Sequence, residues 1–121
     1  MQQHEEREQM ALIQWAELEK GAYPVLGRLF HIPNGGHRNK ATAGRLKAAG
    51  VKKGVPDLCL PVPLGGYAGL YIEMKYGANK PTPEQRDWID FLSSAGYRVD
   101  VCYGCEDAIR AIMRYIKEKA L

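Results

Sequence analysis

The chain has 121 residues, of which 45% are hydrophobic and 26% charged, and its formal net charge is +3. This length fits one domain with a core of its own, and the composition excludes a disordered or collagen-like protein. No apolar run reaches the length of a membrane span, and the polar N-terminus lacks the basic and apolar regions of a signal peptide. We therefore expect a single cytoplasmic domain over residues 1–121, with no membrane segment.

The first part of the chain predicts a helix, a short strand and a second helix. Apolar residues between Glu5 and Glu19 recur at three- and four-residue steps, which is helical spacing. The stretch from Leu29 to Ile32 predicts a short strand, and the Pro-Asn-Gly-Gly sequence that follows predicts a turn. Thr42 to Ala49 predicts a short basic helix, because Gly50 stands where a helix would end.

The second part predicts three strands and two helices. The strands are expected at Pro56–Leu60, Leu70–Lys75 and Tyr97–Cys102, and the helices at Thr82–Ala95 and Glu106–Lys119. The glycine-rich loop between the first two strands suits an antiparallel hairpin, whereas a strand, helix and strand in succession suit a parallel crossover. The predicted fold is therefore α/β, in the order αβαββαβα, with helices flanking a mixed central sheet.

Positive charge is concentrated in one segment. Arg28 to Lys53 contains no acidic residue and carries +7, so by difference from the net +3 the remainder carries −4. Such a segment favours a polyanionic partner. Its candidate DNA-binding residues are Arg38, Lys40, Arg45, Lys47, Lys52 and Lys53.

A carboxylate and a lysine share one face of a predicted strand. Alternation in a strand puts Glu73 and Lys75 on the same side, and pairing across the hairpin brings Asp57 near Glu73. Two crowded carboxylates repel each other unless they are protonated or bridged by a cation such as Mg²⁺. From spacing alone, the commoner explanation is a solvated Glu73–Lys75 pair beside a turn-capping Asp57.

The neighbouring motifs resemble those of the VRR-NUC nucleases, a family of the PD-(D/E)XK superfamily. The matching stretches cover most of the chain and are Glu5-x-x-x-Gln9, Ile32-Pro33-Asn34-Gly35-Gly36, Gly50-Val51-Lys52-Lys53-Gly54-Val55-Pro56-Asp57-Leu58, Ile72-Glu73-Met74-Lys75, Gln85-x-x-Trp88 and Gly96-Tyr97. The Val-Arg-Arg triplet that names the family stands here as Val51-Lys52-Lys53. The two lysines keep the positive charge of the arginines, but they lack the guanidinium groups that can donate two parallel hydrogen bonds to one phosphate.

The resemblance implies an active site and a PD-(D/E)XK nuclease fold. Its metal ligands would be Asp57, Glu73, the backbone carbonyl of Met74 and the N-terminal helix carboxylate Glu5, with Lys75 as the catalytic lysine. Glu6 and Glu8 offer alternative registers for the helix carboxylate, and acidic residues also favour a helix N-terminus for other reasons.

Gln85 resembles the glutamine that lies beside the active site in these nucleases. It also stands three residues after Thr82, where a capping box places a glutamine. We expect the catalytic and capping roles to compete for one side chain.

The activity that the resemblance implies is Mg²⁺- or Mn²⁺-dependent, structure-selective hydrolysis of DNA phosphodiester bonds. Family members of this size cut four-way junctions as homodimers, and a monomeric flap or end nuclease is the alternative.

Two alternative functions come from other classes of protein. One is a DNA-binding module without catalysis, and the other is a thiol oxidoreductase based on Cys102-x-x-Cys105. Glu106 and Asp107 argue against the latter, because their charges disfavour a thiolate. His31 and His37 are expected to be DNA-facing or structural.

Overall fold

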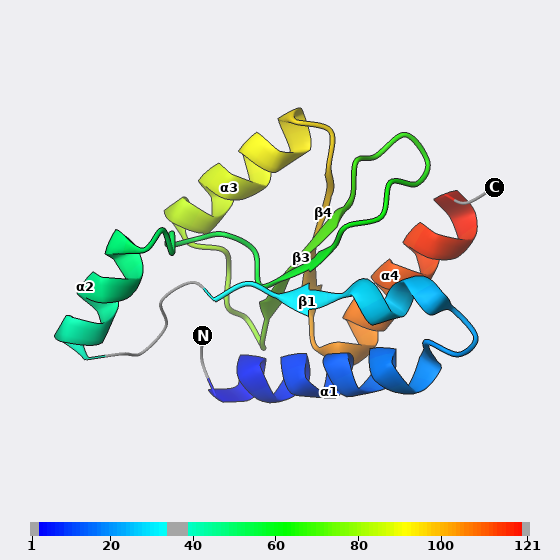
Figure 1. Cartoon of the computed structure of the whole chain (residues 1–121), viewed down its shortest axis with the longest axis horizontal. Helices are drawn as coiled ribbons and strands as arrows, with labels where there is room; N and C mark the ends of the chain where they lie inside the picture. The colour runs from blue at the N-terminus through cyan, green and yellow to red at the C-terminus, as the bar shows by residue number, and fades with distance from the viewer. Residues whose placement is uncertain (1–2, 34–38, 120–121) are drawn as a thin grey trace.

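The computed structural model describes residues 3–33 and 39–119. Its elements follow the predicted order, with one added 3₁₀ helix (Figure 1). They are α1 (Gln3–Glu19), η1 (Pro24–Arg28), β1 (Phe30–His31), α2 (Lys40–Ala48), β2 (Leu58–Leu60), β3 (Leu70–Lys75), α3 (Pro83–Ser94), β4 (Arg98–Tyr103) and α4 (Cys105–Lys119). The predicted turn at 34–36 and the residues His37 and Arg38 lie outside the described residues.

The four strands form one mixed sheet in the order β1-β2-β3-β4. The β1–β2 and β2–β3 pairs are antiparallel, whereas β3 and β4 are parallel and are joined through α3. This confirms the predicted hairpin and crossover. β2 is shorter than predicted, because Pro56 and Asp57 precede its first residue Leu58.

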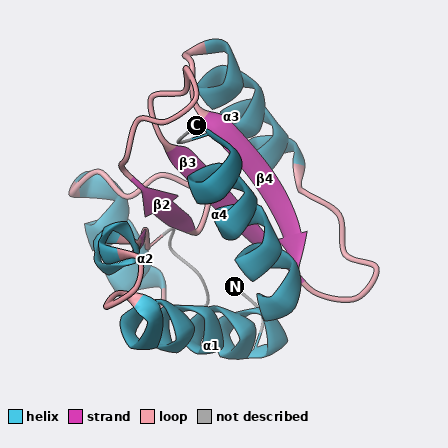
Figure 2. Ribbon diagram, turned by 90° about the vertical axis from the view of Figure 1, so that its right-hand side faces the viewer, coloured by secondary structure: helices cyan, strands magenta, loops and turns pink. Residues whose placement is uncertain are grey.

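The core lies on one face of the sheet. Leu70, Ile72 and Met74 of β3 are fully buried and belong to the same apolar cluster as Leu12 of α1 and Ile112 of α4. Helices α1 and α4 pack against each other and against β3, and α4 crosses in front of the strands in Figure 2. Because side chains alternate along β3, Glu73 and Lys75 point to the opposite face. In the described part of the chain, no helix is long and apolar enough to cross a membrane.

Helix α2 stands apart from the rest of the fold (Figure 1). It begins after Asn39, whose side-chain oxygen accepts a hydrogen bond from the Thr42 N–H at 2.8 Å. None of its nine residues is buried. Its basic residues Lys40, Arg45 and Lys47 are exposed, so this helix presents positive charge to the solvent.

Candidate active site

Asp57 and Glu73 lie opposite each other at the end of the β2–β3 pair. The register pairs Leu58 with Ile72, and one step further along the same register brings Asp57 to Glu73. The Met74 N–H donates to Asp57 Oδ2 at 2.8 Å, which fixes the aspartate against β3. Asp57 is 2% exposed and Glu73 is 1% exposed. The hairpin therefore buries two carboxyl groups side by side, as the sequence predicts.

The surroundings of this pair favour retention of a proton. Burial, and then the charge of Asp57, raise the pKa of Glu73 to about 9. Burial also raises the pKa of Asp57, although hydrogen bonds from Glu73 and the Met74 N–H oppose that effect. Of the two carboxyl groups, Glu73 is the one whose neutral form the surroundings favour more strongly. The closeness of the two carboxyl groups disfavours a state in which both carry a negative charge.

Lys75 shares the strand face of Glu73 and is also buried, at 6% exposure. Its positive charge acts to lower the pKa of Glu73, but burial and the charge of Asp57 outweigh that effect. A lysine is rarely this buried unless a charge or a ligand compensates it. Asp57, Glu73 and Lys75 therefore form one buried cluster, and the solvated Glu73–Lys75 pair that spacing alone favours does not occur.

His31 anchors the backbone of Asp57 to β1. Its Nδ1 lies 2.8 Å from the Asp57 carbonyl oxygen, which also accepts the Ile32 N–H at 2.7 Å. Because a carbonyl only accepts, Nδ1 carries the proton in this contact. His31 thus has a structural contact beside the carboxylate pair, in line with the structural alternative expected from the sequence.

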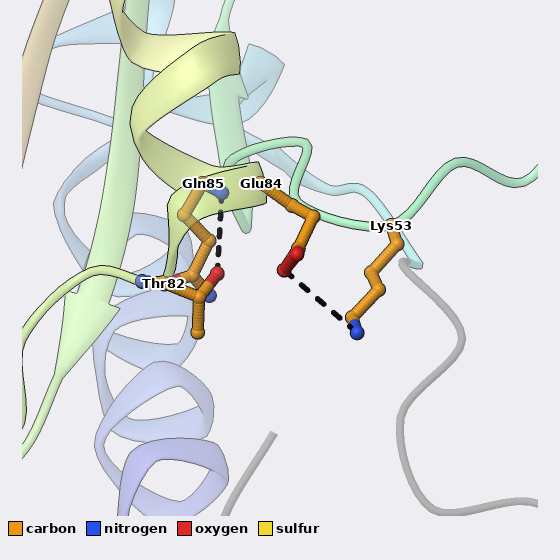
Figure 3. Close-up of polar contacts among 4 residues, drawn as sticks. All are labelled: Lys53, Thr82, Glu84 and Gln85. Atoms are coloured by element: carbon orange, nitrogen blue, oxygen red, sulfur yellow. Dashed lines mark hydrogen bonds and ion pairs between the residues drawn. The ribbon is translucent and has the colours of Figure 1, made fainter.

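Gln85 connects Glu73 to the start of α3, and Figure 3 shows its contact with Thr82. Its Nε2 donates to Glu73 Oε2 at 3.3 Å, while its Oε1 accepts the Thr82 N–H at 2.9 Å. The Gln85 N–H in turn donates to Thr82 Oγ1 at 3.2 Å, which completes the capping box. The expected competition between the two roles was wrong, because the two ends of the amide serve the site and the cap at once.

The basic loop before β2 packs against the same helix start. Gly54 has φ +94°, and a Cβ there would lie 2.6 Å from the Glu84 carbonyl carbon, so only glycine fits this approach. Lys53 Nζ lies 3.8 Å from Glu84 Oε1 in an exposed ion pair (Figure 3). The segment Val51-Lys52-Lys53 is therefore held next to the helix turn that carries Gln85, and both lysines are exposed.

Helix α1 adds two buried polar side chains to this region. Glu5 is 5% exposed and Gln9 is 8% exposed, one helical turn apart. Glu5 Oε2 accepts a hydrogen bond from Asn79 Nδ2 at 3.2 Å, and the charge of Glu5 contributes to the raised pKa values of Asp57 and Glu73. Asn79 could not be recognised from the sequence, because a single polar residue in the loop after β3 carries no motif.

The three glutamates of the first helical turns have different surroundings. Glu8 Oε1 accepts the Cys105 N–H at 2.8 Å and thereby caps α4, and Glu6 is exposed. Only Glu5 is turned toward the carboxylate pair. Of the three glutamates that the sequence offers as the helix carboxylate, Glu5 is therefore the one that lies at the site.

Two buried oxygens among the described residues have no hydrogen-bond partner, Glu73 Oε1 and Gln9 Oε1. A buried acceptor without a partner costs about 1–3 kcal/mol, and a bound cation is one way to offset that cost at Glu73. The donors around Glu73 are hard oxygens, which suit Mg²⁺ or Mn²⁺. In the described residues, however, no three acidic, histidine or cysteine side chains converge with metal-binding geometry, so Glu5 does not join Asp57 and Glu73 in a preformed cage. Two carboxylates and several waters fit the preference of Mg²⁺.

The cysteines show no sign of redox activation. Burial and the charges of Asp107 and Asp100 raise the pKa of Cys102 to about 12. Burial and the nearby charges of Glu8 and Glu106 also raise the pKa of Cys105. Both are free thiols, and a raised pKa disfavours the thiolate that disulfide exchange requires.

Comparisons with known proteins agree with this geometry. The family model described as "VRR-NUC domain" matches residues 3–106. A solved structure named "VRR_NUC domain protein" superposes with a TM-score of 0.79 at 33% sequence identity, over 94% of this chain and 88% of that one. No curated protein matches the sequence. The family model spans most of the chain, and Asp57 and the strand that carries Glu73 and Lys75 lie within it. This chain therefore belongs to the VRR-NUC family of nuclease domains.

Proposed function

We propose that this protein is a Mg²⁺-dependent DNA endonuclease, with Mn²⁺ as an alternative cofactor, that hydrolyses phosphodiester bonds in branched DNA. The observation that carries the proposal is the buried Asp57–Glu73 pair with Lys75 on the same strand face. Burial of two carboxyl groups and an ammonium is costly for the fold, so such a cluster is retained for chemistry more often than for stability. Family membership supports the same conclusion.

In this proposal, Asp57, Glu73 and the Met74 carbonyl would hold the ion. When bound, the ion supplies charge neutralisation at the phosphate and activation of a water. Lys75 donates hydrogen bonds to the attacking water or to the phosphate oxygen on which charge develops. Gln85 keeps the Glu73 carboxylate oriented through its 3.3 Å contact. Glu5 accepts the Asn79 side chain and does not form a three-carboxylate group with Asp57 and Glu73, so its role is to add negative charge beside the ion site.

DNA is proposed to lie across the exposed basic surface upstream of Asp57. The described residues of this surface are Lys40, Arg45 and Lys47 on α2 and Lys52 and Lys53 in the loop before β2. Contacts of this kind go mostly to phosphates, which gives binding that depends on salt and on DNA shape rather than on base sequence. Replacement of Lys52 and Lys53 together by alanine is expected to reduce the salt slope of binding by up to about two units. A Lys20→Ala protein, altered in an exposed Lys20–Glu17 pair at the C-terminal end of α1, is the matched control.

The proposed substrate is a four-way junction, cut by a homodimer. One active site cuts one strand, so paired incisions across a junction require two sites related by a two-fold axis. The test is Mg²⁺-dependent cleavage of four-way, flap and linear DNA of one sequence, with sedimentation of the protein at micromolar concentration. Paired cuts in the four-way junction by a dimer are the expected result. A monomer that cuts flaps and never intact junctions would replace the junction proposal with a flap or end nuclease, and no cleavage of any DNA would refute nuclease function.

A further inference from the structure

Two exposed aromatic rings stack beside the candidate active site. His4 of α1 and Tyr76, which directly follows β3, have ring centroids 4.5 Å apart and an interplanar angle of 14°. His4 is exposed and Tyr76 is 44% exposed, and neither belongs to the apolar core. A stacked pair of aromatic rings that the core does not use is a candidate for contact with another flat ring.

The ring pair is joined to the site through chain neighbours and hydrogen bonds. His4 directly precedes Glu5, and Tyr76 directly follows Lys75. The Tyr76 carbonyl accepts the Asn79 N–H at 3.2 Å, and the Asn79 side chain donates to Glu5 at 3.2 Å. The rings therefore lie next to Glu5 and Asn79, on the α1 side of the carboxylate cluster.

Exposed cations stand near the rings. Arg7 is three residues after His4, a spacing that places both side chains on neighbouring positions of the helix surface. Lys80 follows Asn79 and is also exposed. A flat aromatic surface with cations beside it is the arrangement by which proteins hold a nucleobase and the phosphates next to it.

We propose that the His4–Tyr76 pair is a stacking platform for one unpaired or unstacked nucleobase next to the cleaved phosphate. The inference rests on the proposed DNA cleavage and names the substrate feature that the site selects. Inside a continuous duplex, both faces of every base are covered by neighbours. At a branch point or in a single strand, a base has lost such a neighbour, so a protein ring takes its place at little unstacking cost. The platform thereby explains preference for branched DNA without any base-specific contact.

The test removes the base and the ring separately. A junction substrate is prepared with one abasic site at each of the positions around the cleaved phosphate, and kcat/KM is measured in Mg²⁺ for each substrate relative to the parent junction. For wild type, one position is expected to show a loss of about tenfold, the usual size of a base–aromatic stack. For Tyr76→Leu, the loss at that position falls below twofold. Because each protein is compared with itself, a general effect of the substitution on Lys75 cancels.

Two further variants separate stacking from a merely structural contact. Tyr76→Phe keeps the ring and is expected to restore the abasic penalty of wild type. Phe91→Leu removes another exposed aromatic, 59% exposed and six residues beyond Gln85 on α3, and is expected to leave the penalty unchanged. Equal penalties for wild type and Tyr76→Leu at every position, or no penalty for wild type at any, overturn the platform alone. Failure of wild type to cut the parent junction overturns the proposed function and the platform with it.

Discussion

The Gln85 Nε2 donates to Glu73 Oε2 at 3.3 Å while the same side chain closes the capping box of α3. Two substitutions of Gln85, by glutamate and by alanine, separate its contact with Glu73 from its contact with Thr82. Gln85→Glu keeps an acceptor for the Thr82 N–H but replaces the donor facing Glu73 with a carboxylate. We expect its cleavage rate to fall about tenfold or more, the effect of a lost hydrogen bond to a charged group, with little change in melting temperature. Gln85→Ala should lose activity and also about 1 kcal/mol of stability, because the cap is lost. Wild-type rates in both variants would exclude a role for Gln85 in positioning Glu73.

The raised pKa of Glu73 predicts that the metal-free protein becomes less stable as the pH rises. In the folded protein this pKa is about 9, whereas the ordinary value is 4.5, so between these values the folded state holds a proton that the unfolded state releases. The stabilisation is complete below pH 4.5 and is lost toward pH 9, at no more than about 1.4 kcal/mol per pH unit for one proton.

Urea unfolding in chelator between pH 6 and pH 8.5 measures this slope. Glu73→Gln, which cannot ionise, is the matched control and should show a smaller fall in unfolding free energy over the same range. Parallel curves for wild type and Glu73→Gln would mean that Glu73 is already ionised in the folded protein.

Cleavage should require Mg²⁺ or Mn²⁺, because the buried carboxyl pair needs a divalent cation before it can approach a phosphate. Ca²⁺ is expected to support DNA binding with little cleavage, since its looser coordination holds water and phosphate less strictly. Gel-shift binding and cleavage are measured in parallel with each ion and with excess chelator. Full cleavage in chelator would contradict a metal-dependent mechanism.

The cysteines are expected to be dispensable for catalysis. Cys102→Ser with Cys105→Ser should leave nuclease activity within a few-fold of wild type, because both thiols have raised pKa values and neither forms a disulfide. Cys102 is buried, so the serine variant is compared with Cys102→Ala, which introduces no buried hydroxyl. A double variant that folds normally but does not cut DNA would show that the two cysteines are needed for activity.

Strand periodicity predicted that Asp57, Glu73 and Lys75 lie together, but their spacing alone favoured a solvated pair, and the neighbouring family motifs were needed to predict an active site. Alternation puts Glu73 and Lys75 on one face, and the hairpin register then brings Asp57 to Glu73. The phase of α1 was not predictable, because Glu5, Glu6 and Glu8 differ only in their rotation about the helix axis, and packing against β3 and α4 sets that rotation. The contact of Asn79 with Glu5 joins residues 74 positions apart and has no local sequence signal.

The buried Asp57–Glu73 pair with Lys75 is tested most directly by single-turnover cleavage of a four-way junction in Mg²⁺ by Asp57→Ala, Glu73→Ala and Lys75→Ala. Each variant is first checked for folding by circular dichroism and for junction binding in Ca²⁺, and Lys117→Ala, altered at an exposed lysine of α4, is the matched control. We predict that the three variants fold and bind DNA while their cleavage rates fall by about 100-fold or more, and that the control cuts like wild type. Wild-type-like turnover by a folded Glu73→Ala protein would contradict this assignment of the catalytic centre.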